Sequence, residues 1–194
     1  MERKQKGFTL IELLIVVSII AILSVFVILT LNPAEILKQA RDSQRTSDMS
    51  TLKSAISLYL QDVTSPSIGS VGACYGSAPL TPNSAGCGGR MAASDTAVTT
   101  TTAANAASTT GNGWIPINFA TIVAGSPIGS EPVDPVNNAT YFYSYATGGA
   151  PSYHFEIDAK MESTKYSASG TSDVESTDGG NNNNVFEVGT SLGL

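Results

Sequence analysis

Apolar and polar positions divide the chain into one long apolar run, an amphipathic stretch and a more polar remainder. The run from Phe8 to Leu31 contains a single charged residue, Glu12. About 20 consecutive apolar residues in a helix cross the hydrocarbon core of a bilayer. Residues 8–31 are therefore expected to form a transmembrane helix.

The residues before this run set its orientation. Arg3, Lys4 and Lys6 precede it, and positive residues stay on the cytoplasmic side, so everything after Leu31 is expected to be exported. A secretory signal peptide would have a shorter apolar region with a small-residue cleavage site behind it. Residues 29–33 are not such a site, whereas a plain membrane anchor remains an alternative on hydropathy alone.

Residues 32–62 are expected to continue as an amphipathic helix. Asn32 and Pro33 interrupt the apolar run, and good helix formers resume at residues 34–41. We favour one long helix that is kinked at Pro33. The alternative is a new helix that begins at Pro33 with Asn32 as its cap.

Apolar residues in this helix recur at spacings of three, four and seven. They are Leu52, Ala55, Ile56, Tyr59 and Val63. Such a stripe predicts a face that packs against a sheet. The polar residues around it are expected on solvated faces: Asp42, Gln44, Arg45, Asp48 and Lys53.

Residues 63–139 are rich in turn formers and are expected to be irregular. Residues 92–110 form an Ala/Thr/Ser-rich tract of low complexity. Cys74 and Cys87 are too few for a zinc site, and in an exported domain they are expected to form one disulfide. Trp114 is predicted to be a core residue.

Residues 140–194 are expected to form a small antiparallel sheet. Residues 140–145 are rich in aromatic residues, and residues 152–159 alternate between apolar and polar side chains, which predicts a hairpin with its turn at 148–151. A third strand is expected at residues 184–188. In residues 152–159 the apolar face holds Tyr153, Phe155, Ile157 and Ala159. The fold class is thus α+β, with a long N-terminal helix packed on a small C-terminal antiparallel sheet.

Composition and charge argue against two classes of function, nucleic-acid binding and catalysis. The net charge is −6, so strong nucleic-acid binding is not expected, because that binding rests on neutralising phosphates. The one histidine, His154, lies opposite the apolar face of its strand. The sequence around it shows no motif of a catalytic Ser, His and Asp set. We therefore expect no enzymatic activity and no required cofactor.

Glu12 is the least expected residue of the apolar run. A carboxylate inside a bilayer costs about 2.5 to 3.5 kcal/mol on insertion scales, so it indicates a function. The segment Lys6-Gly7-Phe8-Thr9-Leu10-Ile11-Glu12 resembles the processing motif of type IV prepilins and type II secretion pseudopilins. The resemblance implies the pilin fold, with residues 1–7 as a leader peptide.

The resemblance also implies a mechanism. A prepilin peptidase would cleave between Gly7 and Phe8 and then N-methylate Phe8. Removal of the leader, which holds three basic side chains and Glu2, would change the net charge from −6 to −8. In the filament the Glu12 carboxylate would face the Phe8 amine of a neighbouring subunit. Opposite charges attract strongly in a low-dielectric bundle, so this pair would select the stagger between subunits.

The function implied is that of a structural subunit of a type IV pilus-like surface filament. The implied partners are membrane lipid before assembly, identical or homologous pilin subunits, the prepilin peptidase and an inner-membrane assembly platform. The chain would first be a single-pass protein of the cytoplasmic membrane. Two alternatives remain: a periplasmic pseudopilin of type II secretion, and a monomeric membrane-anchored exported domain.

The polar loop before the third strand carries one further expectation. Major pseudopilins bind calcium in the corresponding loop, and Ca²⁺ prefers carboxylate and amide oxygens. The resemblance therefore implies a calcium site at Asp173, Asp178 and Asn181, with a solvated polar loop as the alternative. Glu131-Pro132-Val133-Asp134-Pro135 also resembles the turn that leads into the hairpin of pseudopilin heads.

Overall fold

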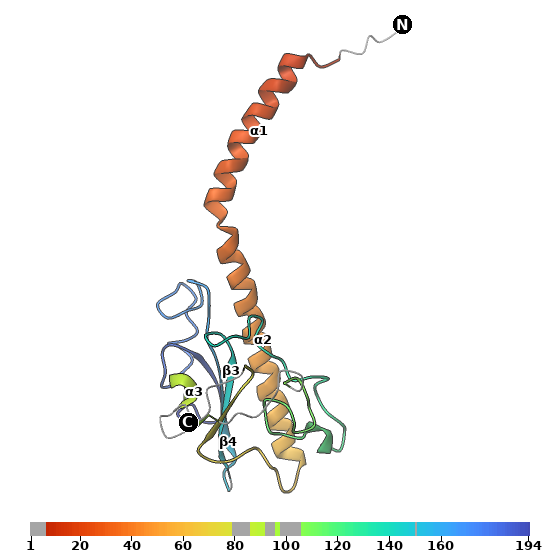
Figure 1. Ribbon diagram of the computed structural model, residues 1–194, viewed down its shortest axis with the longest axis vertical. Coiled ribbons are helices and arrows are strands. Elements are labelled where there is room, and N and C mark those ends of the chain that lie inside the picture. The colour runs from red at the N-terminus through yellow and green to blue at the C-terminus, as the bar shows by residue number, and fades with distance from the viewer. Residues whose placement is uncertain (1–6, 79–85, 92–95, 98–105, 150) are drawn as a thin grey trace. The chain divides into compact units, whose positions relative to one another are not determined.

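The computed structural model describes residues 7–78, 86–91, 96–97, 106–149 and 151–194 (Figure 1). The chain divides into two compact units, Met1–Leu37 and Lys38–Leu194. The low-complexity tract expected at residues 92–110 falls mostly outside the described residues.

The first unit contains helix α1, Leu10–Leu31, and the start of helix α2, Pro33–Asp62. Between them Asn32 takes a left-handed conformation with φ 39° and ψ 77°. Its carbonyl oxygen accepts hydrogen bonds from Glu35 N at 3.0 Å and Ile36 N at 3.3 Å, so it opens α2. The prediction of one long helix kinked at Pro33 is therefore wrong. The structure has the alternative, in which a new helix begins at Pro33. Pro33 has no N–H to continue the helical ladder, and Asn tolerates the left-handed region.

Helix α1 has the length and composition of a membrane span. The window Leu10–Ile28 has a mean hydropathy of 3.0, and none of it is buried by the rest of the chain. Its hydroxyl groups donate to carbonyls of the preceding turn: Ser18 to Leu14 at 2.8 Å and Ser24 to Ile20 at 2.7 Å. These hydroxyls therefore need no water, which suits a helix in lipid.

The second unit packs residues 38–62 of α2 on a five-stranded sheet with the order β2-β1-β3-β4-β5. The strands are β1 Ala73–Gly76, β2 Thr96–Ala97, β3 Tyr143–Gly149, β4 His154–Ala159 and β5 Phe186–Gly189. The β1/β3, β3/β4 and β4/β5 pairs are antiparallel, and the short β2 pairs with β1 in parallel. A short helix α3, Gly86–Gly89, and a 3-10 turn η1, Phe119–Thr121, lie in the connections. The predicted α+β fold class is confirmed.

All three predicted strands differ in their bounds. The strand expected at 152–159 begins at His154, and the one expected at 184–188 runs from Phe186 to Gly189. Tyr153, predicted on the apolar face of its strand, lies in the turn before it with φ 40°. The first hairpin strand was expected at 140–145 but runs from Tyr143 to Gly149. The reason is local, because the Asn138 side chain accepts hydrogen bonds from Thr140 N at 2.8 Å and Tyr141 N at 2.9 Å, which holds them in a turn. The region expected to be irregular contributes β1 and β2, which have only four and two residues.

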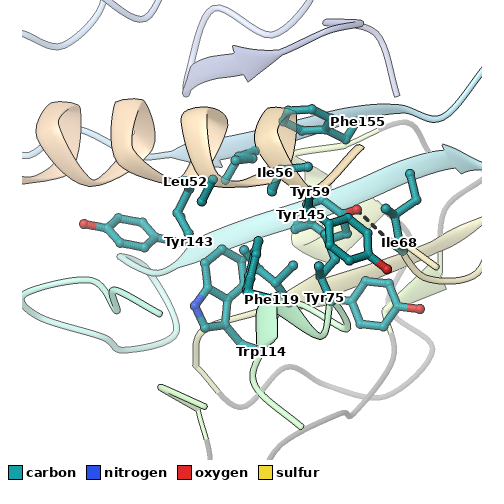
Figure 2. Packing of buried hydrophobic residues seen from close by; sticks show 14 of the residues in the cluster. Leu52, Ile56, Tyr59, Ile68, Tyr75, Trp114, Phe119, Tyr143, Tyr145 and Phe155 are labelled. Carbon is teal, nitrogen blue, oxygen red and sulfur yellow. Dashed lines mark hydrogen bonds between the residues drawn. The ribbon is translucent and has the colours of Figure 1, made fainter. Parts of the chain in front are cut away.

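The core lies between α2 and one face of the sheet (Figure 2). Leu52, Ile56 and Tyr59 supply the helix side, as the apolar stripe predicted, and Val63 packs at its edge. Trp114 is completely buried, which confirms its predicted place in the core. Aromatic side chains from the sheet and the loops fill the space between: Tyr75, Phe119, Tyr143, Tyr145 and Phe155.

The polar faces of α2 differ from the prediction. Gln44 and Lys53 are exposed as expected, but Asp42 and Arg45 are completely buried and Asp48 is nearly so. The Arg45 guanidinium donates to carboxylates on the Asp42, Asp134 and Glu162 side chains. Buried charges require such partners, and two of these partners come from segments far along the chain.

Candidate processing and assembly site

The first turn of α1 is held by a reciprocal pair of side chains. Thr9 is the N-cap, and its Oγ1 accepts a hydrogen bond from Glu12 N at 3.3 Å. In return Glu12 Oε2 accepts from Thr9 N at 2.8 Å and from Thr9 Oγ1 at 2.7 Å. This is a capping box, which satisfies two of the backbone donors that a helix start leaves open.

Sequence reasoning assigned Glu12 to assembly and missed this local role. The signal was present, since Thr9 and Glu12 have the Thr-x-x-Glu spacing directly before an apolar run. Glu12 thus has a structural function within its own chain before any partner arrives.

The cap leaves the Gly7–Phe8 bond outside the helix. Phe8 is 86% exposed, and a Cβ built on Gly7 would meet nothing within 4 Å. Packing among the described residues therefore does not require glycine at position 7. A small residue there suits an external enzyme that must approach the backbone closely.

The Glu12 carboxylate keeps one oxygen for a further donor. Its hydrogen bonds from Thr9 N and Thr9 Oγ1 both involve Oε2, and among the described residues Oε1 receives no hydrogen bond. The side chain is exposed within the chain and lies at the positive end of the helix dipole. In lipid, such a carboxylate is stabilised by a cationic partner.

The predicted disulfide is formed in the second unit. Cys74 of β1 and Cys87 of α3 are joined with an S–S distance of 2.02 Å and a Cα–Cα distance of 5.9 Å. Both residues are completely buried.

The residues of the expected calcium site act as acceptors within their loop. The Asp173 carboxylate accepts hydrogen bonds from the Ser176 hydroxyl and from the backbone N–H groups of Ser176 and Ser169, and these hydrogen bonds lower its pKa. Asp178 accepts from Gly180 N at 2.9 Å and Glu187 N at 2.6 Å.

Asn181 contributes its backbone N–H to Glu187 Oε1 at 3.3 Å. In the part of the chain that the structure describes, Asp173 and Asp178 do not belong to a group of three or more acidic side chains close enough to hold one metal ion. The calcium site at these three residues stays a prediction.

Sequence reasoning missed a group of buried acids, Glu156, Asp158 and Glu187. The alternation in residues 152–159 placed Glu156 and Asp158 opposite the apolar face but did not indicate that this second face is covered too. Burial raises the pKa of Glu156 to about 7. Burial and the negative charge of Glu156 also raise the pKa of Asp158 well above its usual value.

Comparison with protein families matches the prokaryotic N-terminal methylation motif at residues 3–28. The comparisons with curated proteins and with solved structures found no match. The matched residues include Gly7, Phe8, Thr9 and Glu12, so the match and the local geometry concern the same segment. Residues 3–28 of this chain carry the prokaryotic N-terminal methylation motif, the signal of type IV pilin-like and pseudopilin-like precursors.

Proposed function

We propose that this chain is a structural subunit of a type IV pilus-like filament. The observation that carries the proposal is the exposed Gly7–Phe8 bond, directly before a capped helix of membrane length that bears Glu12 in its first turn. The capping box does not need a charged side chain, since glutamine closes it too, so a plain membrane anchor has no use for the charge of Glu12.

Processing creates the second half of the assembly contact. A prepilin peptidase that cuts after Gly7 frees the Phe8 amine, and the same enzyme methylates it. The amine is a cation at the end of an apolar helix, and Glu12 Oε1 remains available to receive it. Opposite charges attract strongly in a low-dielectric bundle, and either charge left alone there is costly.

The pair therefore acts on register more than on overall stability. In a bundle of α1 helices, only staggers that bring a Phe8 amine to a Glu12 carboxylate satisfy both groups. The apolar side chains around α1, which the chain itself leaves exposed, supply the packing surface. Lipid covers this surface before assembly, and neighbouring subunits cover it in the filament.

The test separates the charge of Glu12 from its role as a cap. Glu12→Gln keeps an acceptor that can close the capping box but removes the charge. Thr9→Ala removes the hydroxyl of the box but keeps the carboxylate. Filaments are sheared from cells and counted by electron microscopy, while the membrane fraction is probed for the chain and its N-terminus is read by mass spectrometry.

We expect Glu12→Gln and Glu12→Ala to abolish or greatly reduce filaments, with the chain still present in the membrane. Thr9→Ala should still assemble. If Glu12→Gln assembles normally while Thr9→Ala fails, capping is the function of Glu12 and the charge-pairing mechanism is wrong. If the unchanged chain is processed but forms no surface filament, it is a periplasmic pseudopilin or a membrane-anchored exported domain.

A further inference from the structure

The register of β4 and β5 brings three acidic side chains to one face of the sheet. Glu156 and Asp158 are two residues apart on β4, so they share a face. Asp158 pairs with Glu187 of β5. Phe155 and Ile157, which alternate with these acids along β4, point to the other side, into the main core.

The acidic face is covered by other parts of the chain. Glu156 and Asp158 have no exposed surface, and Glu187 is 2% exposed. The same region contains a second, small apolar cluster around the disulfide, made of Cys74, Cys87, Met91, Ala146 and Leu194. Leu194 also donates its backbone N–H to Glu156 Oε2 at 2.8 Å. The C-terminal end of the chain is thus tied to the acid group.

The hydrogen bonds of the three carboxylates are incomplete. Glu187 accepts from Asn181 N at 3.3 Å and Asn182 N at 3.0 Å. From the described residues Asp158 Oδ2 receives only a long hydrogen bond, from Ser144 Oγ at 3.4 Å. Glu156 Oε1 and Asp158 Oδ1 are buried and have no hydrogen-bond partner in the described part of the chain. Buried polar atoms are nearly always satisfied, so these two atoms point to a missing ligand.

The charges around the group do not balance either. Arg90 is the cation that acts on Asp158, but its guanidinium donates to the carbonyl oxygens of Phe142 and Thr140. With all three carboxylates ionised, three negative charges would face one guanidinium, a surplus of two, and Asp178 adds another acid beside Glu187. Uncompensated buried charge is strongly unfavourable.

We propose that Glu156, Asp158 and Glu187 bind one divalent cation, for which calcium is the best fit. One oxygen from each carboxylate lies within 4.8 Å of the other two. Ligands on opposite sides of a calcium ion are about 5 Å apart, because each Ca–O distance is about 2.3 to 2.6 Å. The ion would balance the surplus charge and take the two unpartnered oxygens as ligands.

The donor set favours calcium over other divalent ions. All three side chains offer carboxylate oxygens, whereas zinc sites are usually built with Cys or His ligands. Calcium accepts carboxylates in bidentate form and tolerates irregular geometry, while magnesium demands near-octahedral geometry and keeps several waters. This site lies on β4 and β5. The loop site expected at Asp173, Asp178 and Asn181 has a different ligand set but adjoins it, because Asn181 N donates to Glu187 Oε1 and Glu187 N donates to Asp178.

The test uses the full-length protein in detergent. Purified protein, stripped with EGTA, is titrated with CaCl₂ and, separately, MgCl₂ by isothermal titration calorimetry, and its thermal unfolding is followed through Trp114 fluorescence. We expect one calcium per chain, weaker magnesium binding, and a midpoint that rises by roughly 5–10 °C at about 100 times the Kd.

Variants assign the ion to its residues. Asp158→Asn and Glu187→Gln should each weaken calcium binding at least about tenfold. Asp173→Asn, a matched acid-to-amide change in the exposed loop, should leave it unchanged. Circular dichroism of each variant checks that it folds, and the titration of the unchanged protein does not depend on any variant.

Two results would overturn the proposal. If Asp173→Asn abolishes calcium binding and the two strand variants do not, calcium occupies the loop. If the unchanged protein binds no calcium and EGTA leaves its unfolding midpoint where it was, protons rather than a metal ion neutralise these carboxylates.

Discussion

Arg45 and Asp134, which are 89 residues apart in the chain, form a two-pronged ion pair in the interior. Arg45 Nε lies 2.6 Å from Asp134 Oδ2, and Nη2 lies 2.9 Å from Oδ1. Both side chains are completely buried. Arg45 also binds Asp42 at 2.7 Å and Glu162 at 2.6 Å, so one guanidinium connects α2 to the loop before β3 and to the segment after β4.

Replacement of Arg45 by methionine should destabilise the folded protein by about 3 to 5 kcal/mol. The change keeps an unbranched side chain but leaves the carboxylates of Asp42 and Asp134 buried without their cation. Chemical unfolding followed through the fluorescence of Trp114, the chain's single tryptophan, measures the effect. The matched control is Lys53→Met on an exposed position of the same helix, which should change stability by no more than about 0.5 kcal/mol. Equal effects of the two changes would contradict the role assigned to the Arg45 network.

Ionisation of Glu131 should make the folded protein less stable as pH rises. The Glu131 side chain is almost completely buried, Oε2 accepts a hydrogen bond from Ile115 N at 3.0 Å, and Oε1 has no partner among the described residues. Burial raises the pKa of Glu131 to about 8, from an ordinary value of 4.5. The folded state therefore holds a proton that the unfolded state releases, and stability falls as pH rises between about 4.5 and 8.

Glu131→Gln removes this titration. We expect the variant to gain stability relative to the unchanged protein as pH rises through that window, by at most about 1.4 kcal/mol per pH unit. Unfolding midpoints of both proteins at several pH values measure the difference. Asp173→Asn is the control of opposite sign, because hydrogen bonds lower the pKa of Asp173 and its contribution is lost as pH falls. The difference in unfolding midpoint between Glu131→Gln and the unchanged protein should change from about pH 4.5 to 8. If that difference stays constant, Glu131 ionises normally.

The disulfide should contribute about 3 kcal/mol to stability, mainly by restricting the unfolded chain across a sequence separation of 13 residues. The double change Cys74→Ala and Cys87→Ala tests this value by chemical unfolding. A reducing agent should lower the stability of the unchanged protein and leave that of the double variant unaltered. If the reductant destabilises both proteins equally, it acts elsewhere.

The parts of the fold that the sequence predicted are those specified by local periodicity. The apolar run became α1, and the stripe of Leu52, Ile56 and Tyr59 became the helix side of the core. The strands β1 and β2 escaped prediction because four and two residues are too few to show a period. β1 pairs with β3, which lies about 70 residues further along the chain, and β2 pairs with β1.

The buried charges could not be predicted for a related reason. Asp42, Arg45 and Asp48 have the composition of a solvated helix face, and only the fold brings Asp134 and Glu162 to them. The processing segment shows the opposite case. Gly7, Phe8 and Glu12 were predicted because their meaning lies in a short contiguous motif, and even the missed capping box has a local signature.

Gly7 offers the most direct test of processing without disturbing the fold. The space around its Cβ position is open, and Gly7 lies before the capped helix, so Gly7→Leu should leave both α1 and the head unchanged. The peptidase, which must approach the Gly7–Phe8 bond closely, should reject the larger residue. Mass spectrometry of the membrane fraction should then show that residues 1–7 are retained.

The retained leader also bears on assembly. Without cleavage there is no Phe8 amine for Glu12 to meet, and the three basic residues of the leader stay attached to the end of α1. We therefore expect Gly7→Leu to give membrane-inserted chain and no filaments, while Gly7→Ala, which adds one methyl group, should still be processed at least in part. Filaments built from uncleaved Gly7→Leu subunits would show that assembly does not require the new amine. Absence of the chain from the membrane would instead mean that the change disturbs insertion, contrary to the open surroundings of Gly7.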